Sequence, residues 1–351
     1  MSYFLFQMKR SLERFVFTEY FTFGKFLNAA SIFSQAFIFK NSKVFAHPIK
    51  VTLDPTNICM LSCPLCPTGQ KRKERPLGKM KFEDFKKLVE EISPYLYEID
   101  LNNWGEPFLN DEVYKMIEFA HSKKIKTSVN TNLNVKFTEK QAERIVKSGL
   151  DVLYCSFDGI SQKTYEKYRI NGKLKTVFEN IRLVNKKKKE LGSKKPSVTW
   201  QFLVMKHNEK ELPELQKIKN ELEIDTLLVG AVRTDLGKEI FQSDNEKVSQ
   251  LEKWLPQDSQ LSRYDYESRK RKLQREYCYF PWLVAVINWD GSTSPCCAVY
   301  QKKDDFGNVF KDGFKKVWNN EKYRQARRII AKKAPEAGNV CSNCIRTGFI
   351  D

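Results

Sequence analysis

Between residues 49 and about 230, short apolar stretches alternate with longer amphipathic ones, and this alternation limits the fold more than any other feature. Six stretches are typical of strands: Ile49–Leu53, Glu98–Leu101, Lys126–Asn130, Val152–Phe157, Val198–Val204 and Thr226–Val229. The clearest helices between them are Lys81–Ile92, Asp111–Ser122, Thr138–Lys147, Lys175–Leu191 and Lys210–Leu222. Strands joined by crossover helices form a parallel sheet covered by helices. The pattern therefore predicts an α/β fold, an open or partial (β/α)6 barrel whose chemistry lies in the loops after the strands.

The composition divides the rest of the chain around this core. We expect an N-terminal amphipathic extension over 1–48, the core over 49–234, a highly charged connector over 235–276 and a small C-terminal α+β unit over 277–351. The C-terminal unit holds five of the nine cysteines. Its predicted elements are an apolar strand at Leu283–Ile287, a turn at Asp290-Gly291 and a helix near Gly313–Ala331.

The N-terminal extension is rich in phenylalanine, with eleven of the 25 in the chain, and lysine and arginine residues lie among them. Phe26, Ala30, Phe33 and Phe37 follow helical spacing and predict a helix with one apolar face. Two interpretations stay open: a helix that rests on a membrane surface through residues 1–45, or an extension packed on the core. The fourteen-residue uncharged run from Phe26 to Phe39 is too short to cross a bilayer. We expect a cytoplasmic protein, with peripheral contact to the inner face of the membrane under the first interpretation.

Charge and motifs narrow the function classes. The 61 Lys and Arg against 43 Asp and Glu give a net charge of +18, which favours anionic partners such as nucleic acid, lipid headgroups or phosphorylated substrates. The chain has only three histidines and neither an HExxH nor a GxxxxGK[ST] pattern, so zinc-peptidase and P-loop functions lose their sequence support. Nine cysteines without a secretory signal indicate a reducing compartment, where grouped cysteines bind metal.

Three cysteines follow the first predicted strand directly, as Cys59-x3-Cys63-x2-Cys66. Soft thiolates suit iron–sulfur clusters, and three of them leave the fourth iron of a cubane cluster without a protein ligand. A zinc site is the alternative, although it uses four ligands and usually paired cysteines. The position at the carboxyl end of the first strand of a β/α domain favours the cluster.

The segment Leu53 to Pro67 (LDPTNICMLSCPLCP) resembles the cluster loop of the radical SAM superfamily. Gly105-Glu106-Pro107 after the second strand looks like the motif that holds the amino group of S-adenosylmethionine. Asn132 after the third strand, Ser156 and Asp158 after the fourth, and Arg169 resemble further cofactor positions, although Leu133 stands where glycine is common. The resemblance covers about residues 49–230, in the order of the family.

The resemblance implies a 4Fe–4S cluster held by Cys59, Cys63 and Cys66, to which S-adenosylmethionine binds and is cleaved reductively to a 5′-deoxyadenosyl radical. Glu106 would accept a hydrogen bond from the cofactor's ammonium and Arg169 would pair with its carboxylate. A structural ion pair is the alternative for each of these two residues. Ser156 and Asp158 have a helix-capping alternative.

The second cysteine group is Cys278, Cys296, Cys297, Cys341 and Cys344. From spacing alone, zinc competes with a fully ligated 4Fe–4S cluster. The layout resembles the SPASM/twitch extension of radical SAM enzymes, and no cysteine follows Cys344. The resemblance therefore implies one auxiliary cluster on Cys278, Cys296, Cys341 and Cys344, acting as an electron relay, with Cys297 spare or substituting for Cys296. Cys155, in the fourth strand, is interpreted as a buried core thiol, with a hydrogen-atom donor as the alternative.

The resemblance fixes the opening step of the reaction and leaves the substrate open. Our first hypothesis is hydrogen abstraction from a small molecule, a sugar or a lipid-linked precursor, with electrons from a reductant such as flavodoxin or ferredoxin. A peptide-modifying maturase and an RNA-modifying enzyme are the alternatives. Nucleic acid is not the expected partner, because the chain lacks a recognisable RNA-binding motif. A non-catalytic electron carrier is the fourth hypothesis, and it predicts no cleavage of S-adenosylmethionine.

Overall fold

The computed structural model describes residues 19–234, 253–268, 271–272 and 277–346. All six expected strands form, each within two residues of its predicted bounds: β1 Lys50–Leu53, β2 Glu98–Leu101, β3 Lys126–Thr131, β4 Val152–Ser156, β5 Ser197–Val204 and β6 Thr226–Ala231. They pair in parallel in the order β6-β5-β4-β3-β2-β1. The predicted parallel α/β sheet is confirmed. Most of the predicted connector, and residues 1–18 of the predicted extension, lie outside the described residues.

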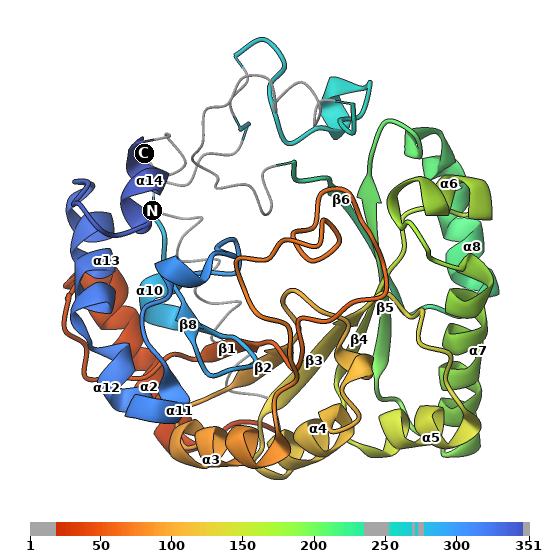
Figure 1. The fold of residues 1–351 in the computed structure, drawn as a ribbon. Coiled ribbons are helices and arrows are strands. Elements are labelled where there is room, and N and C mark those ends of the chain that lie inside the picture. The colour runs from red at the N-terminus through yellow and green to blue at the C-terminus, as the bar shows by residue number, and fades with distance from the viewer. Residues whose placement is uncertain (1–18, 235–252, 269–270, 273–276, 347–351) are drawn as a thin grey trace.

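The C-terminal part of the chain adds two strands to this sheet. The predicted strand β7, Val284–Ile287, pairs in parallel with β1, and Leu53 stands opposite Ile287. The two-residue strand β8, Thr293–Ser294, pairs antiparallel with β7 across the turn that contains Gly291. Among the described residues, the sheet thus has eight strands with β6 and β8 as its two edges, and it curves as an open barrel (Figure 1). Sequence analysis placed Leu283–Ile287 in a separate small unit and missed this pairing.

Helices line the outer side of the curved sheet (Figure 1). They are α3 Phe82–Ile92, α4 Val113–Ser122, α5 Glu139–Lys147, α6 Gln162–Tyr168, α7 Leu174–Glu190 and α8 Leu215–Glu221. The capping box of Thr138 and Gln141 starts α5, and Gly149, with φ of +79°, follows its end. The outward residues of the strands, such as Val51, Ile99 and Trp200, join these helices in one hydrophobic core.

Two predicted helices are interrupted, one at a proline and one at an asparagine that caps a new helix. The stretch Lys210–Leu222 forms a 3₁₀ turn at Glu209–Glu214 before α8, because Pro213 inside it has no N–H to donate. The stretch Gly313–Ala331 splits into α12 Phe314–Trp318 and α13 Glu321–Lys332, because the Asn320 side chain caps the second helix. The remaining short elements are η2 Pro107–Leu109, η4 Ser259–Leu261, α10 Phe280–Leu283, η5 Lys302–Asp304, α11 Val309–Asp312 and α14 Cys341–Arg346.

The described part of the N-terminal extension packs on the core and on the C-terminal unit. Its helix α2, Phe23–Phe33, continues as the π-helical turn η1, Ser34–Ile38. The prediction of a helix is confirmed. The buried positions of α2 and η1 are Lys25, Asn28, Ala29, Ile32, Gln35 and Ala36. Of the predicted stripe, Phe33 and Phe37 are partly buried and pack against the same core, whereas Ala30 is exposed. The Trp282 indole donates to the Asn41 carbonyl. The Asn319 side-chain amide accepts from the Val44 N–H and donates to the Val44 carbonyl.

The same segment also presents apolar side chains to solvent. Phe23, Leu27, Ile38, Phe39 and Phe45 are exposed, and Phe45 keeps 81% of its surface accessible. No helix in the described part of the chain has the length and apolar character needed to span a bilayer.

The inner face of the sheet is polar. Lys50 of β1 forms ion pairs with Glu98 (3.1 Å) and Asp100 (2.6 Å) of β2, and the Ser128 hydroxyl donates to Asp100 (2.6 Å). Farther along, the Asn130 amide and the Ser156 hydroxyl bond each other and Gln201 of β5. These residues alternate with the buried apolar ones along each strand, as the two-residue period of a strand requires.

Candidate functional site

Cys59, Cys63 and Cys66 lie on one loop that leaves the carboxyl end of β1. The base of this loop is closed by the buried side chains of Thr56 and Asn57. Asn57 donates to the Pro76 carbonyl (2.8 Å) and accepts from the Gly78 amide (2.9 Å), while the Thr56 hydroxyl donates to the Gly78 carbonyl (2.7 Å). The three cysteines therefore stand on a loop whose two ends are fixed to each other.

The three thiols lie close enough to influence one another. Burial raises the pKa of Cys59 to about 12 and that of Cys63 to about 11, and the nearby Cys66 raises both further. The Arg169 guanidinium opposes the rise in the pKa of Cys63. Thiols with such pKa values are protonated at neutral pH, so they bind metal with release of their protons.

The β2 loop approaches the cysteine loop closely at Gly105. A Cβ atom at this position would overlap the carbonyl oxygen of Thr56, so only glycine fits. The next amide, of Glu106, donates to the Ile58 carbonyl (2.9 Å), and Pro107 begins η2. The predicted motif thus lies directly beside the loop that carries Cys59.

Glu106 is fully buried, and three donors already meet its carboxylate. The Thr131 hydroxyl donates at 2.7 Å, the Asn132 amide at 2.8 Å and the Phe108 amide at 3.2 Å. Burial nevertheless raises the pKa of Glu106 to about 7. A cation beside Glu106 would favour its ionised form.

Asn132 joins this carboxylate to the sulfur of the first cysteine. Its side-chain amide lies 3.4 Å from Cys59 Sγ and donates to it. The following residue, Leu133, has a φ of +54°, the left-handed conformation that glycine adopts without strain. Leu133 therefore adopts the backbone conformation that the glycine common in the family would adopt, although a side chain makes this conformation strained.

Asp158 and Arg169 form an ion pair beside Cys63. The Arg169 Nε donates to Asp158 Oδ2 at 2.7 Å, and the Leu203 amide donates to the other carboxylate oxygen at 2.7 Å. Helix α6 is capped by Ser161, so the capping alternative for Ser156 and Asp158 is wrong. Ser156 instead belongs to the hydrogen-bonded group with Asn130 and Gln201 on the inner face.

The second cysteine group is gathered from three segments. Cys278 precedes α10, Cys296 and Cys297 follow β8, and Cys341 and Cys344 lie on α14. Burial raises the pKa of Cys341, and Cys344, Cys296 and Cys278 also raise it. Burial likewise raises the pKa of Cys296, and Cys297, Cys344 and Cys278 also raise it. The structure thus brings together all four predicted ligands, with Cys297 next to Cys296.

Cys155 lies apart from both groups. It is fully buried in the hydrophobic core, and its Sγ contacts the Leu153 carbonyl at 3.7 Å. It faces the helices, whereas its neighbour Ser156 faces the inner side of the barrel. This position agrees with the interpretation as a core thiol.

The residues present fit an iron–sulfur cluster of the kind predicted. The donor set on the first loop consists of three thiols within eight residues, and an amide donor meets one of the sulfurs. Soft sulfur ligands with hydrogen bonds to them are the environment of protein-bound clusters. In the described residues, no three His, Cys, Asp or Glu side chains are arranged around a single metal ion.

Several residues of this site were not found by sequence analysis. They are Thr56 and Asn57 at the base of the cysteine loop, Asn130 and Gln201 on the inner face, and Arg75, which is buried nine residues after Cys66. Polar residues at alternate positions of apolar strands were the signal available for Asn130 and Gln201. The contacts of Arg75 lie more than 210 residues away in the chain and leave no local pattern.

Comparison with known proteins agrees with this site. Residues 53–217 match the radical SAM superfamily, and residues 278–345 match the SPASM iron-sulfur cluster-binding domain. The chain belongs to the radical SAM superfamily, carries a C-terminal SPASM domain and is an enzyme of that class. Membership implies 4Fe–4S clusters and binding of S-adenosylmethionine.

Two curated relatives are similar to this chain in sequence, and a solved structure is similar to it in fold. The tungsten-containing aldehyde ferredoxin oxidoreductase cofactor-modifying protein of Pyrococcus furiosus is 24% identical, over 79% of this chain and 82% of that protein. The AdoMet-dependent heme synthase of Methanosarcina barkeri is 20% identical, over 85% of this chain and 91% of that protein. Streptococcus suis SuiB bound to the precursor peptide SuiA has a similar fold, with a TM-score of 0.59 and 14% identity over 85% of this chain and 70% of that chain.

Proposed function

We propose that this enzyme uses Cys59, Cys63 and Cys66 to hold a 4Fe–4S cluster to which S-adenosylmethionine binds. When bound, the cluster and S-adenosylmethionine supply a 5′-deoxyadenosyl radical that abstracts a hydrogen atom from the substrate. The observation that carries this proposal is the fixed loop with three neighbouring thiols, one of which accepts a hydrogen bond from Asn132. A set of three leaves one iron of a cubane cluster without a protein ligand.

The surrounding residues have defined roles in this proposal. Gly105 lets the β2 loop touch the cysteine loop, so that Glu106 stands where an ammonium group would meet a carboxylate. Asn132 orients both Glu106 and Cys59 through its two donors. Asp158 holds Arg169 beside Cys63, where the guanidinium presents positive charge to the carboxylate of the cofactor. Ser156 and Pro107 complete the cofactor site from β4 and η2.

We propose a small polar molecule as the substrate. The inner face of the barrel carries an ion-paired group of Lys50, Glu98 and Asp100 and a hydrogen-bonded group of Asn130, Ser156 and Gln201. Groups of this kind recognise hydroxyl, carbonyl and amino functions and disfavour a bare hydrocarbon chain, whose burial against them leaves polar atoms unpaired. A sugar, the polar head of a lipid-linked precursor or a cofactor precursor meets this requirement. The two curated relatives named for work on a cofactor and a heme support this class, whereas the SuiB structure with its precursor peptide supports the peptide alternative.

We propose that Cys278, Cys296, Cys341 and Cys344 hold one auxiliary 4Fe–4S cluster, as in the twitch form of the extension. The mutual effect of these thiols on their pKa values supports this set, and Cys297 also raises the pKa of its neighbour Cys296. Four protein ligands leave no open iron, so this cluster would relay electrons, with flavodoxin or ferredoxin as the external reductant.

We propose that the N-terminal extension also rests on an anionic membrane surface. One side of it packs on the enzyme, while Phe23, Leu27, Phe39 and Phe45 face solvent near the exposed Lys43. Aromatic and cationic side chains together favour the headgroup layer of anionic lipids. Replacing the four apolar residues by serine should remove binding to vesicles of anionic lipid and leave the cleavage of S-adenosylmethionine unchanged.

The catalytic proposal is tested by reducing the anaerobically reconstituted enzyme in the presence of S-adenosylmethionine and measuring 5′-deoxyadenosine. The wild-type chain should form it, and a variant with alanine at Cys59, Cys63 and Cys66 should not. Cys155→Ala serves as the control, because that thiol lies in the core. A wild-type enzyme that forms no 5′-deoxyadenosine would leave only the electron-carrier hypothesis. Candidate polar metabolites that increase its formation then identify the substrate.

A further inference from the structure

We infer that Arg75 is a positioning residue that fixes the two cysteine groups relative to each other. The inference rests on the proposed function in one respect, the assignment of both groups as cluster ligands. Arg75 belongs to the loop of the first group, nine residues after Cys66. Its side chain is fully buried, with no accessible surface. A buried guanidinium needs partners for its donors, and the hydrogen-bond acceptors of Arg75 all come from the segment that carries the second group.

The guanidinium meets this segment at three residues. Both of its terminal nitrogens donate to Asp305, at 2.9 and 2.7 Å, in a forked ion pair. One of them also donates to the Ser292 hydroxyl at 2.9 Å, and Nε donates to the Tyr300 carbonyl at 3.0 Å. A planar fork with fixed donors specifies orientation as well as attraction, which a lysine ammonium does not.

The partners of Arg75 are connected to the turn of Cys296 and Cys297 through hydrogen bonds or through short sequence distances. Asp305 also accepts from the Ser294 hydroxyl (2.9 Å), and Ser294 is two residues before Cys296. Tyr300 is three residues after Cys297. A short run of buried hydrogen bonds therefore links the loop of Cys66 to the turn of Cys296.

Two further contacts join the same loops. The Tyr300 ring packs edge-on against Trp104, with centroids 5.2 Å apart, and Trp104 directly precedes Gly105 of the cofactor motif. The Trp289 indole, in the loop after β7, donates to the carbonyl of Pro76, the neighbour of Arg75. The loops after β1, β2 and β7 thus converge around Arg75.

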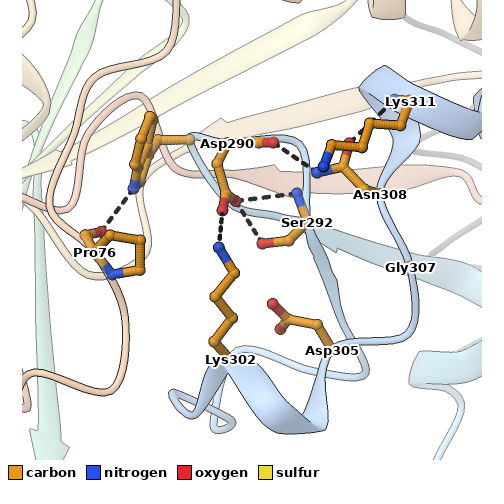
Figure 2. A pocket seen from close by; sticks show the side chains of 9 residues that line it. Pro76, Asp290, Ser292, Lys302, Asp305, Gly307, Asn308 and Lys311 are labelled. Carbon is orange, nitrogen blue, oxygen red and sulfur yellow. Dashed lines mark hydrogen bonds and ion pairs between the residues drawn. The ribbon is translucent and has the colours of Figure 1, made fainter.

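The outer side of this junction is open to water. A cavity of about 480 Å³ is lined by Pro76, Trp289, Asp290, Lys302 and Asp305, among others. Asp290 accepts from the Ser292 amide and hydroxyl and pairs with Lys302 at 3.0 Å (Figure 2). The sheet itself does not depend on these side chains, because β1 and β7 are joined by backbone hydrogen bonds. The Arg75–Asp305 pair therefore acts on the loops beyond the strands rather than on the fold.

The experiment compares Arg75→Met, Asp305→Asn, Arg75→Lys and the double variant Arg75→Met with Asp305→Leu, which leaves no buried charge unpaired. Arg144→Met, which removes an exposed ion pair with Glu118, is the matched control. Hydrogen exchange of the full chain without cofactor is measured first. We expect exchange in segments 67–79 and 292–305 to rise about tenfold or more in the Arg75→Met and double variants, and not in the control. Unchanged exchange in the double variant overturns the inference.

The positioning role is then read from electron paramagnetic resonance of the reconstituted, reduced enzyme. With iron content equal to that of the wild type, the magnetic interaction between the two clusters should change in Arg75→Met and in the double variant. Arg75→Lys, which retains the charge and loses the fork, should keep the iron and still show the altered interaction. An unaltered interaction in all variants overturns the positioning role. A wild-type chain that binds no iron overturns the proposed function instead, while the exchange result still decides whether Arg75 joins the two segments.

Discussion

The two cysteine groups are built in opposite ways. The first occupies one loop, closed at its base by Thr56 and Asn57, and its three thiols lie within eight residues of sequence. The second is collected from three segments, whose outermost cysteines are 66 residues apart, and it relies on the packing of β8, α10 and α14. The first group is therefore specified locally, while the second is specified by the tertiary structure.

Because the two groups are built differently, different substitutions should disrupt them. A local loop is damaged by changes to its own hydrogen bonds or to the backbone that touches it. A site assembled from distant segments is damaged by changes to packing and to long-range ion pairs such as Arg75 with Asp305.

Gly105→Ala should have the largest effect, and at the first group only. The new methyl group would overlap the Thr56 carbonyl, so the β2 loop must move away from the cysteine loop. We expect a loss of about 3 kcal/mol in the free energy of unfolding and loss of 5′-deoxyadenosine formation. Chemical denaturation and product analysis measure the two effects. Gly24→Ala in α2 is the control, since its Cβ meets ordinary contact at 3.7 Å; equal losses in both variants would contradict the prediction.

The buried charge of Glu106 predicts a pH dependence of the cofactor-free chain. The pKa of Glu106 is raised to about 7 by burial, above the value near 4.5 of an unfolded glutamate. The folded state therefore favours the protonated form, and stability falls as pH rises from 4.5 to 7, by about 3 kcal/mol. In Glu106→Gln this part of the decline should vanish, as seen in denaturation curves across that pH range. Parallel curves for the two proteins would show that Glu106 titrates normally.

Asn57→Ala should loosen the first group and leave the second intact. The change removes two hydrogen bonds and leaves the Gly78 amide without its Asn57 acceptor, while the Pro76 carbonyl keeps the Trp289 indole, at a cost of about 2 kcal/mol. We expect iron to be lost from the first cluster under mild chelation, while the auxiliary cluster stays. Equal loss of iron from both clusters would mean that the loop is not specified locally.

Cys297→Ala should have the smallest effect, although it lies next to a proposed ligand. The proposed set of Cys278, Cys296, Cys341 and Cys344 already provides four ligands, so it does not require Cys297. We expect the variant to keep its iron and to lose less than about 0.5 kcal/mol of stability. Cys296→Ala, by contrast, should lose the auxiliary cluster. If the two variants exchange these outcomes, Cys297 is the ligand.

The sequence predicted the parts of the structure that depend on local periodicity. Strands β1 to β7 and the helices α3, α4, α5 and α7 follow from alternating and helical spacing, and the first cysteine group follows from its position after β1. The resemblance supplied Gly105, Glu106 and Asn132, which lie beside that group. These features are confined to short stretches, so their patterns survive in the sequence.

The parts that were missed depend on pairs far apart in the chain. The pairing of β7 with β1 joins residues more than 230 positions apart, and the contact of Arg75 with Asp305 spans 230 positions. Apolar spacing identified the packing face of the N-terminal segment only in part, because the polar side chains of Asn28 in α2 and Gln35 in η1 are buried there through hydrogen bonds to the His47 and Phe45 backbone. Such residues are chosen by tertiary contacts, which override local hydrophobicity.

The central claim is that the first loop supplies three sulfur ligands to one cluster and the second group supplies four to another. Iron quantification of the anaerobically reconstituted protein, with and without alanine at Cys59, Cys63 and Cys66, tests it most directly. We predict about eight irons per wild-type chain, as two 4Fe–4S clusters require, and about four in the triple variant. Bound zinc in place of iron, or an iron content that the triple substitution leaves unchanged, would contradict the account.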